Sequence, residues 1–354
     1  MLHQSLKQAR IAKALKLREV ASFLNIDQAL ISKFEKGDRV PTWDQLTLLS
    51  KTLSLDLQNL KTDWLADKIV KMVQYEPYAL EVLAVAESRV EYLVSSKTFD
   101  VPEISLELNE KLDFVDQLKR KWAKVKPLNQ TQLAKMKEFF NVENTFESNR
   151  IEGNTLSLQE THLVVNEGLT IGGKSMREHL EAVNHIDALG FIEELIVRKE
   201  DVTKRNLLEL HSLILKGVDT ANAGVYRSVP VRISGSRHEP VQPYLLDKLM
   251  EDFFLHYKSQ KNRLHPVILA AEVHERLVSI HPFIDGNGRF SRLLMNMVLL
   301  QNGYTLTHIK GDTVSRLAYY RSLEDVQVNN NPEPFYELVI DSVIHSLQEH
   351  LKMV

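Results

Sequence analysis

Residues 267–301 carry the pattern that most restricts how this chain can fold. Residues 267–280 place apolar side chains at helical spacing, and Pro282 ends that predicted helix. Residues 290–301 are apolar on nearly every side, which predicts a helix in the middle of a core rather than on its surface. One short loop joins the two helices, so its position must be fixed by the core on both sides.

That loop, residues 281–289, has the sequence HPFIDGNGR. Gly286 and Gly288 allow an anion to approach the backbone closely, and Asn287 tolerates the left-handed conformation that such loops often need. A loop that opens into a helix presents free backbone N–H groups at the positive end of the helix dipole. These features predict a binding site for phosphate groups.

Four side chains in and after the loop carry chemistry. Arg289 and Arg292 are three residues apart on one predicted helix face, from which both can reach a phosphate chain. Asp285 supplies a hard oxygen for Mg²⁺, which keeps phosphates as its other ligands. His281, with an ordinary pKa of about 6.5, is available as a neutral base near pH 7. A glycine-rich turn with a helix-capping histidine would explain any one of these residues, but the whole set predicts phosphoryl or nucleotidyl transfer.

The segment from His281 to Arg292 resembles the signature of the Fic family, His-Pro-Phe-x-[Asp/Glu]-Gly-Asn-Gly-Arg-x-x-Arg, at every position. The resemblance, which extends over roughly residues 110–340, implies an all-α core that transfers AMP from ATP to a Ser, Thr or Tyr hydroxyl of a protein. It implies that His281 deprotonates the hydroxyl and that Asp285 holds Mg²⁺. The residues that it implies for phosphate binding are Gly286, Asn287, Gly288, Arg289 and Arg292.

Tyr319 and Tyr320 resemble the stretch that lines the adenine pocket in Fic proteins, and so are expected in the ATP site. Family members often have Asn where Gln327 stands here. Helical spacing alone would place both tyrosines in the core.

Residues 224–240, which we call the flap, alternate and then turn at Ser-Gly-Ser, which predicts a small β-hairpin in an otherwise helical body. In Fic proteins such a flap pairs with an extended target segment by strand addition. The residues expected to contact the target are Val231, Ile233 and His238. A surface hairpin with no binding role is the alternative.

Residues 148–153, which we call the inhibitory segment, form a second match. Ser148 and Glu152 are at i and i+4 on one predicted helical turn, which Gly153 ends. The segment resembles the [Ser/Thr]-x-x-x-Glu-[Gly/Asn] motif of Fic proteins in which the glutamate pairs with the second arginine of the signature, here Arg292. An arginine held in this way cannot bind the γ-phosphate, so the resemblance implies autoinhibition. An ordinary surface turn is the alternative, and a role of Glu152 in removing AMP stays open.

The first 60 residues contain nine Lys or Arg and six Asp or Glu, a net charge of +3, whereas the rest of the chain carries −6. Asp27 is a predicted N-cap for a helix over 28–36, which Gly37 ends. Residues 17–57 resemble the phage-repressor type of helix-turn-helix, which implies double-stranded DNA as a partner. The residues expected at the DNA are Gln28, Ala29, Ser32 and Lys33 in the major groove and Arg39 at a phosphate. A helical module that binds only proteins is the alternative.

The length of 354 residues exceeds one ordinary core. We expect a helix-turn-helix domain over 1–60, a helical linker over 61–105 with an interruption at 95–102, and a Fic domain over 106–354 whose first helix ends before Pro127. The absence of cysteine excludes disulfides and thiolate metal sites. No segment has the ~20 apolar residues of a membrane span or the apolar block of a signal peptide, so a cytoplasmic protein is expected.

The combined prediction is an autoinhibited protein adenylyltransferase that uses ATP and Mg²⁺ and is linked to DNA binding, most simply as a homodimer that meets two half-sites. Two alternatives stay open: a transcription regulator that uses the site to sense ATP, and a transferase of another phosphate-linked group. Sensing needs no base, so His281 favours an enzyme. His211 and His274 are expected to be buried hydrogen-bonding residues.

Overall fold

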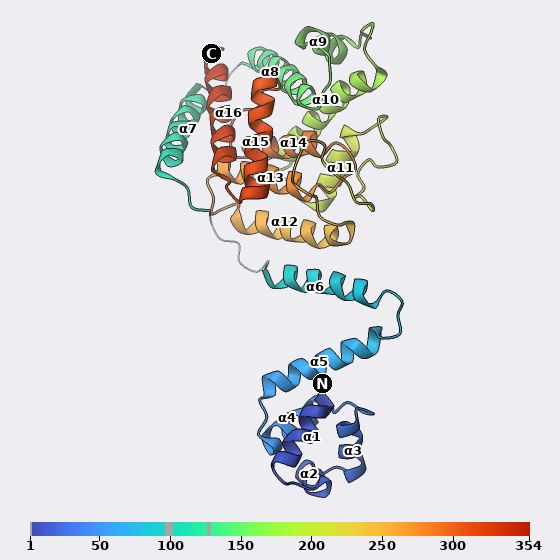
Figure 1. Ribbon diagram of the computed structural model, residues 1–354. Helices are drawn as coiled ribbons and strands as arrows, with labels where there is room; N and C mark the ends of the chain where they lie inside the picture. The colour runs from blue at the N-terminus through green and yellow to red at the C-terminus, as the bar shows by residue number, and fades with distance from the viewer. Residues whose placement is uncertain (1, 96–101, 126–128) are drawn as a thin grey trace. The chain divides into compact units, whose positions relative to one another are not determined.

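The computed structural model describes residues 2–95, 102–125 and 129–354, and these residues form helices and no strand (Figure 1). The predicted all-α class is confirmed. The chain divides into two compact units, Met1–Ser95 and Ser96–Val354. None of the described helices combines the length and the apolar character that crossing a membrane requires. Residues 96–101 of the predicted interruption at 95–102, and Pro127, where a helix stop is predicted, lie outside the described part.

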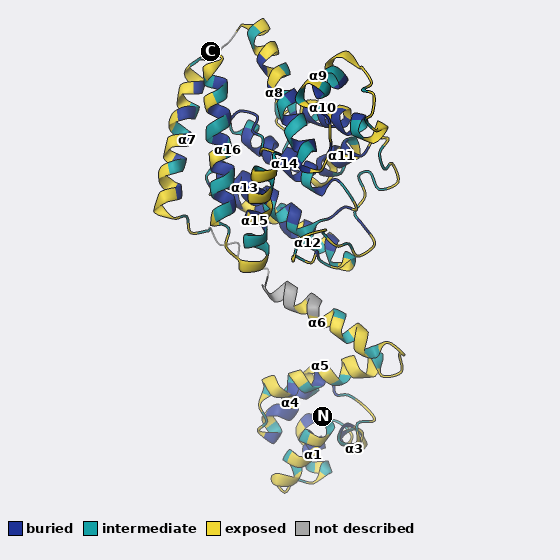
Figure 2. Cartoon of the chain, turned by 45° about the horizontal axis from the view of Figure 1, so that its top comes forward, coloured by how far each residue is buried: buried dark blue, intermediate teal, exposed yellow. Residues whose placement is uncertain are grey.

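The amino-terminal unit has its core between its first five helices (Figure 2). Asp27 caps the third helix by accepting the N–H of Ala29 at 2.6 Å, and Gly37, with φ of +82°, ends that helix. Both caps are as predicted. The helices of this unit are α1 (Leu2–Ala12), α2 (Leu17–Leu24), α3 (Gln28–Lys36), α4 (Trp43–Leu53), α5 (Leu57–Val73) and α6 (Ala79–Ser95).

Helices α2 and α3 form the predicted helix-turn-helix. The inner side of α3 buries Ile31 and Phe34 in the core. The residues predicted to meet DNA lie on its outer side or just after it, exposed except for the half-buried Ser32: Gln28, Ala29, Ser32, Lys33 and Arg39. This face is therefore available to a ligand of the amino-terminal unit.

The carboxy-terminal unit is a larger helical body with α13 and α14 at its centre (Figures 1 and 2). Its helices are α7 (Leu106–Val125), α8 (Gln130–Ile151), α9 (Leu158–Glu167), α10 (Met176–Val197), α11 (Lys204–Ile214), α12 (Leu246–Gln260), α13 (Pro266–Ile280), α14 (Asn287–Gln301), α15 (Thr313–Asn329) and α16 (Glu333–Lys352), with the short 3₁₀ helix η1 (Pro243–Leu245) before α12. Helix α14 packs on α13, α10, α11 and α8.

Helix α14 is buried along almost its whole length, as its all-round apolar sequence predicts. It begins at Asn287, three residues before the predicted start at Phe290, because Gly286 with φ of +79° lets the chain turn directly into the helix. The polar residues of its first turn are consequently buried within the body of the protein.

The β-hairpin predicted for the flap is not formed, and this prediction was wrong. The turn itself is present, because the N–H of Ser236 donates to Ile233 O at 3.2 Å. The two sides of the flap are joined not by a strand ladder but by the buried Arg227, whose guanidinium donates to Val229 O at 3.0 Å and to Val241 O at 2.5 Å. An alternating sequence predicts an extended chain but does not say which groups satisfy its carbonyls.

Candidate active site

The loop between α13 and α14 is closed by its own hydrogen bonds. His281, with φ of +51°, ends α13 by donating its N–H to Leu277 O at 2.9 Å. Asn287 accepts the N–H of Phe283 at 3.0 Å and donates to Phe283 O at 2.9 Å. The left-handed residues are His281 and Gly286, not Asn287. The side-chain amide of Asn287 is used within the loop, so Asn287 can offer a phosphate only its backbone N–H.

The imidazole of His281 is held in a single tautomer. Nδ1 lies 3.3 Å from Val278 O, and since a carbonyl oxygen only accepts, Nδ1 carries the proton. Nε2 has no hydrogen bond among the described residues, so its lone pair is free. Burial, the largest influence, lowers the pKa of His281 to about 4. The side chain is therefore a neutral base at pH 7.

The carboxylate of Asp285 already has several donors. Oδ1 accepts the N–H of Gly286 at 2.6 Å, and Oδ2 accepts Nη2 of Arg177 at 2.6 Å. Burial alone would raise the pKa of Asp285, but Arg289, Gly286 and Arg177 together hold it below its usual value. The group is ionised and its side chain is 38% exposed, as a carboxylate that receives a divalent cation needs to be.

The two arginines of the signature are both buried, but they point to different partners. Nη1 of Arg289 lies 3.1 Å from Glu181 Oε1, an ion pair without hydrogen-bond geometry, and Nη2 lies 3.5 Å from Asp285 Oδ1. Arg292 instead donates from Nη2 to Glu152 Oε1 at 2.6 Å. The sequence prediction that both could reach one phosphate chain from one helix face holds only if these partners give way.

The inhibitory segment meets Arg292 at three points. Beyond the ion pair with Glu152, the guanidinium donates to Ser148 Oγ at 3.1 Å and to Ser148 O at 2.9 Å. A Cβ built on Gly288 would lie 2.3 Å from Glu152 Oε1, which shows that this carboxylate lies directly against the first turn of α14. An acidic group thus occupies the helix N-terminus that the sequence predicts as a phosphate site.

The two tyrosines predicted for the ATP site have different environments. Tyr319 is 2% exposed, and its hydroxyl lies 3.4 Å from Arg292 Nη1 and 3.1 Å from His274 Nε2. Tyr320 is 45% exposed and donates to Ile151 O at 3.0 Å. Of the two tyrosines, only Tyr320 is exposed enough to contact a ligand, whereas Tyr319 is buried and accepts a hydrogen bond from Arg292.

The flap lies over the end of α13. Nε2 of His238 donates to Ser279 O at 2.8 Å, and Nε of Arg227 donates to His281 O at 2.8 Å. Val231 and Ile233 are half-buried beside them. The flap is thus tied by side chains to the residue that carries the candidate base.

Sequence reasoning missed the roles of three residues that shape the site, namely Arg177, Glu181 and Arg227. Arg227 lies in the predicted flap, whereas Arg177 and Glu181 belong to no motif, and the contacts of all three with the 281–289 loop join residues far apart in the chain. His211 was expected to be a buried hydrogen-bonding residue, and this is confirmed. Its Nε2 donates to Asp285 O at 2.9 Å and its Nδ1 accepts the N–H of Gly224 at 2.9 Å, so it links loop and flap.

Two family models match the chain. The Fic/DOC family model matches residues 201–299, and a helix-turn-helix model matches residues 6–60. Curated proteins with the name protein adenylyltransferase Fic are similar. The one from Drosophila grimshawi is 36% identical over 219 residues, which cover 62% of this chain and 44% of that protein. The one from Drosophila mojavensis is 32% identical over 283 residues, which cover 79% and 55%. The chain spans about half the length of these curated relatives.

Solved structures show the same fold. A Fic domain-containing signaling protein from Bacteroides thetaiotaomicron is 30% identical, with a TM-score of 0.62, over 68% of this chain and 97% of that chain. Fic-1 from C. elegans is 25% identical, with a TM-score of 0.63, over 99% of this chain and 98% of that chain.

Proposed function

The chain belongs to the Fic/DOC family, and from this premise we propose that it is an autoinhibited protein adenylyltransferase that transfers AMP from ATP to a Ser, Thr or Tyr hydroxyl of a protein. The observation that carries the proposal is a neutral imidazole, with its Nε2 lone pair free, beside a helix N-terminus that already attracts a carboxylate. A base next to an anion site is what transfer of a phosphate-linked group to a hydroxyl requires.

In the proposed reaction, the oxygen of the target hydroxyl bonds to the α-phosphorus of ATP while Nε2 of His281 takes the proton of that hydroxyl. The bond between that phosphorus and the oxygen that bridges it to the β-phosphate breaks, and pyrophosphate leaves. The hydrogen bond from Nδ1 to Val278 O keeps Nε2 as the atom that accepts the proton. His211 and Arg227, through Asp285 O and His281 O, hold the loop backbone in place.

The phosphates would bind the backbone N–H groups at 286–289 and, once their present partners release them, Arg289 and Arg292. Asp285 would hold Mg²⁺, because Mg²⁺ takes one or two protein carboxylates and completes its shell with phosphate oxygens and water. When bound, the ion would neutralise charge on the phosphates. Tyr320 would face the adenine, and the flap, through Val231, Ile233 and His238, would position the target.

The inhibitory segment would keep this site inactive. Glu152 holds the arginine that the γ-phosphate needs, and Ser148 accepts two further hydrogen bonds from the same guanidinium. Burial opposes the charge on Arg292, but Glu152 and Tyr319 raise its pKa above the ordinary value, so the guanidinium keeps its charge. ATP would then bind without correct alignment of its α-phosphate until Glu152 moves away.

Mass spectrometry of the purified chain after incubation with Mg²⁺ and ATP tests the proposal. An added AMP group on the chain itself or on a lysate protein supports it and identifies the acceptor residue. Nucleotide binding with no transfer, even when Glu152 is replaced by glycine, would favour the ATP sensor instead. Competition with UTP and the other nucleoside triphosphates separates AMP transfer from the transfer of a different phosphate-linked group.

The pH dependence of the rate should reflect the lowered pKa of His281. Because that pKa is about 4, the base is neutral at pH 7, and the rate should fall only as pH drops well below about 5.5. The Glu152 carboxylate raises the pKa of His281, so the Glu152→Gly enzyme should lose activity at lower pH still. Initial rates at ATP concentrations well below KM measure this, because kcat/KM reports the pKa of the free enzyme, and circular dichroism confirms folding. A midpoint near 6.5 would contradict the assignment.

We propose that the amino-terminal unit binds double-stranded DNA as a homodimer and that the enzyme acts in the cytoplasm, where a protein that uses both ATP and DNA finds them together. The exposed polar face of α3 and the net charge of +3 over residues 1–60 support this. In this proposal the DNA-binding domain comprises residues 1–60, the linker residues 61–105 and the Fic domain residues 106–354.

Substitutions at a predicted phosphate contact and at a predicted base contact should affect DNA binding differently. With a duplex selected by the full chain from a random pool, Arg39→Ala should weaken binding to all sequences and reduce the slope of log affinity against log salt by about 1. Gln28→Ala should lower affinity for the selected duplex by roughly 5- to 100-fold, with little effect on random DNA. Lys51→Ala on α4 is the control. Equal behaviour of the three variants would count against a DNA-reading role of α3.

A further inference from the structure

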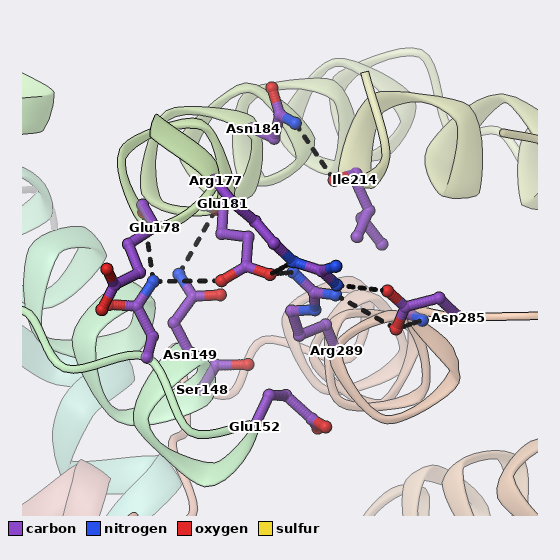
Figure 3. Close-up of polar contacts among 12 residues, drawn as sticks. Ser148, Asn149, Glu152, Arg177, Glu178, Glu181, Asn184, Ile214, Asp285 and Arg289 are labelled. Atoms are coloured by element: carbon purple, nitrogen blue, oxygen red, sulfur yellow. Dashed lines mark hydrogen bonds and ion pairs between the residues drawn. The ribbon is translucent and has the colours of Figure 1, made fainter. Parts of the chain in front are cut away.

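Arg177 lies in the first turn of α10, outside every motif of the sequence. Its Nη2 donates to Asp285 Oδ2 at 2.6 Å, and its Nε donates to Glu181 Oε1 at 3.0 Å (Figure 3). The side chain is 59% exposed. One guanidinium therefore connects a carboxylate of its own helix with the carboxylate that is the candidate Mg²⁺ ligand.

These contacts leave Asp285 poorly prepared for a cation. Oδ2 accepts from Arg177, and Oδ1 accepts from Gly286 N–H at 2.6 Å and lies 3.5 Å from Arg289 Nη2. A divalent cation needs an oxygen lone pair that no donor occupies, and a guanidinium at hydrogen-bond distance also repels it. Arg289 belongs to the buried core of the site, so Arg177 is the exposed cation that can leave.

A second acceptor is already in place for that movement. Glu181 contacts Nε of Arg177 at 3.0 Å, so Arg177 can release Asp285 and keep one charged partner. The same turn of α10 holds the residues that follow Glu152, because Asn154 donates to Glu178 O and to Glu181 Oε2, each at 3.1 Å. Figure 3 shows Arg177 and Glu181 between Glu178 and Asp285. The beginning of α10 thus contacts Asn154, which follows the inhibitory segment, and also Asp285, the candidate Mg²⁺ ligand.

We propose that Arg177 is a second restraint on the enzyme, which competes with a divalent cation for Asp285, so that Mg²⁺ binds only when Arg177 retains Glu181 alone. The inference rests on the proposed function, since it requires Mg²⁺ to enter with ATP at Asp285. Arg177 acts through Asp285 and not on the substrate, so it is a positioning residue.

The test measures nucleotide affinity rather than turnover. In a Glu152→Gly, His281→Ala background, which leaves the site open and without its base, calorimetry gives the ATP affinity in EDTA and at rising Mg²⁺. Arg177→Ala should lower the Mg²⁺ concentration that gives half of the affinity gain by about 1.5- to 5-fold, the range for loss of one largely exposed ion pair. The affinity in EDTA should stay within about twofold.

Arg198→Ala is the matched control, because Arg198 follows the last turn of the same helix, pairs with Glu194 at 3.0 Å and is 60% exposed. Arg177→Lys keeps the charge but cannot bridge both carboxylates, and should lie between wild type and Arg177→Ala. An unchanged Mg²⁺ midpoint in Arg177→Ala overturns the inference, as does a loss of ATP affinity in EDTA, which would make Arg177 a phosphate ligand. If the background variant binds ATP with no Mg²⁺ dependence, the proposed metal site fails first and the inference fails with it.

Discussion

Replacement of Glu152 by glycine should raise the rate of AMP transfer about 10- to 100-fold. The substitution removes the charged hydrogen bond of 2.6 Å from Arg292, and such bonds contribute ~1.5–3 kcal/mol. Arg292 keeps the two bonds to Ser148, so the buried guanidinium does not lose all its acceptors. The γ-phosphate can then bind where the carboxylate was. Incorporation of labelled AMP into the chain itself or into a lysate measures the effect.

Glu167→Gly is the control for this substitution. Glu152 follows the last residue of α8 and Glu167 is the last residue of α9, and each precedes a left-handed glycine, Gly153 with φ of +93° and Gly168 with φ of +66°. The backbone change is therefore similar while Arg292 is untouched. Glu152→Gln should give an intermediate rate, because it keeps the side chain and removes its charge. Equal rates for wild type, Glu152→Gly and Glu167→Gly would mean that the ion pair is structural and that nothing about it restrains catalysis.

Replacement of His281 by alanine in the Glu152→Gly background should reduce AMP transfer by about 100- to 10,000-fold, the usual contribution of a general base. ATP affinity should change little, because the proposed phosphate ligands are backbone N–H groups and arginines. The loss should therefore be seen in kcat. Single-turnover rates together with calorimetric ATP affinity separate the two quantities.

The backbone of His281 requires its own control, because the residue is left-handed with φ of +51°. Alanine is strained there, whereas asparagine adopts that conformation readily and supplies no base. His281→Asn should therefore be as inactive as His281→Ala but as stable as the parent in thermal unfolding. Activity in His281→Asn near the parent value would show that the imidazole has only a structural role.

Local patterns predicted the helices around the site well. The apolar spacing of residues 267–280 and 290–301 corresponds to α13 and α14, because burial on one side or on all sides leaves a direct trace in composition. The caps at Asp27 and Gly37 were also predictable, because each depends only on neighbours within a few residues.

Contacts between distant residues were not predictable from spacing. Arg177 and Asp285 are 108 positions apart, and no rule of periodicity connects them. The pairing of Glu152 with Arg292 was expected only through a family resemblance. The prediction of a β-hairpin in the flap was wrong for a related reason. Alternation predicts an extended backbone, but the carbonyls of Val229 and Val241 accept hydrogen bonds from the buried Arg227, whose position depends on the packing of the carboxy-terminal unit.

Under the proposed function, the missing side chain at Gly288 has a consequence for how autoinhibition can be lost. The Glu152 carboxylate fits only because position 288 has no Cβ, and the incoming phosphate would need that same space. A larger residue there would displace both the Glu152 carboxylate and the bound phosphate. The protein would then be inactive rather than constitutively active. Spontaneous mutations that free the enzyme should therefore accumulate in α8 and its end, and not in the catalytic loop.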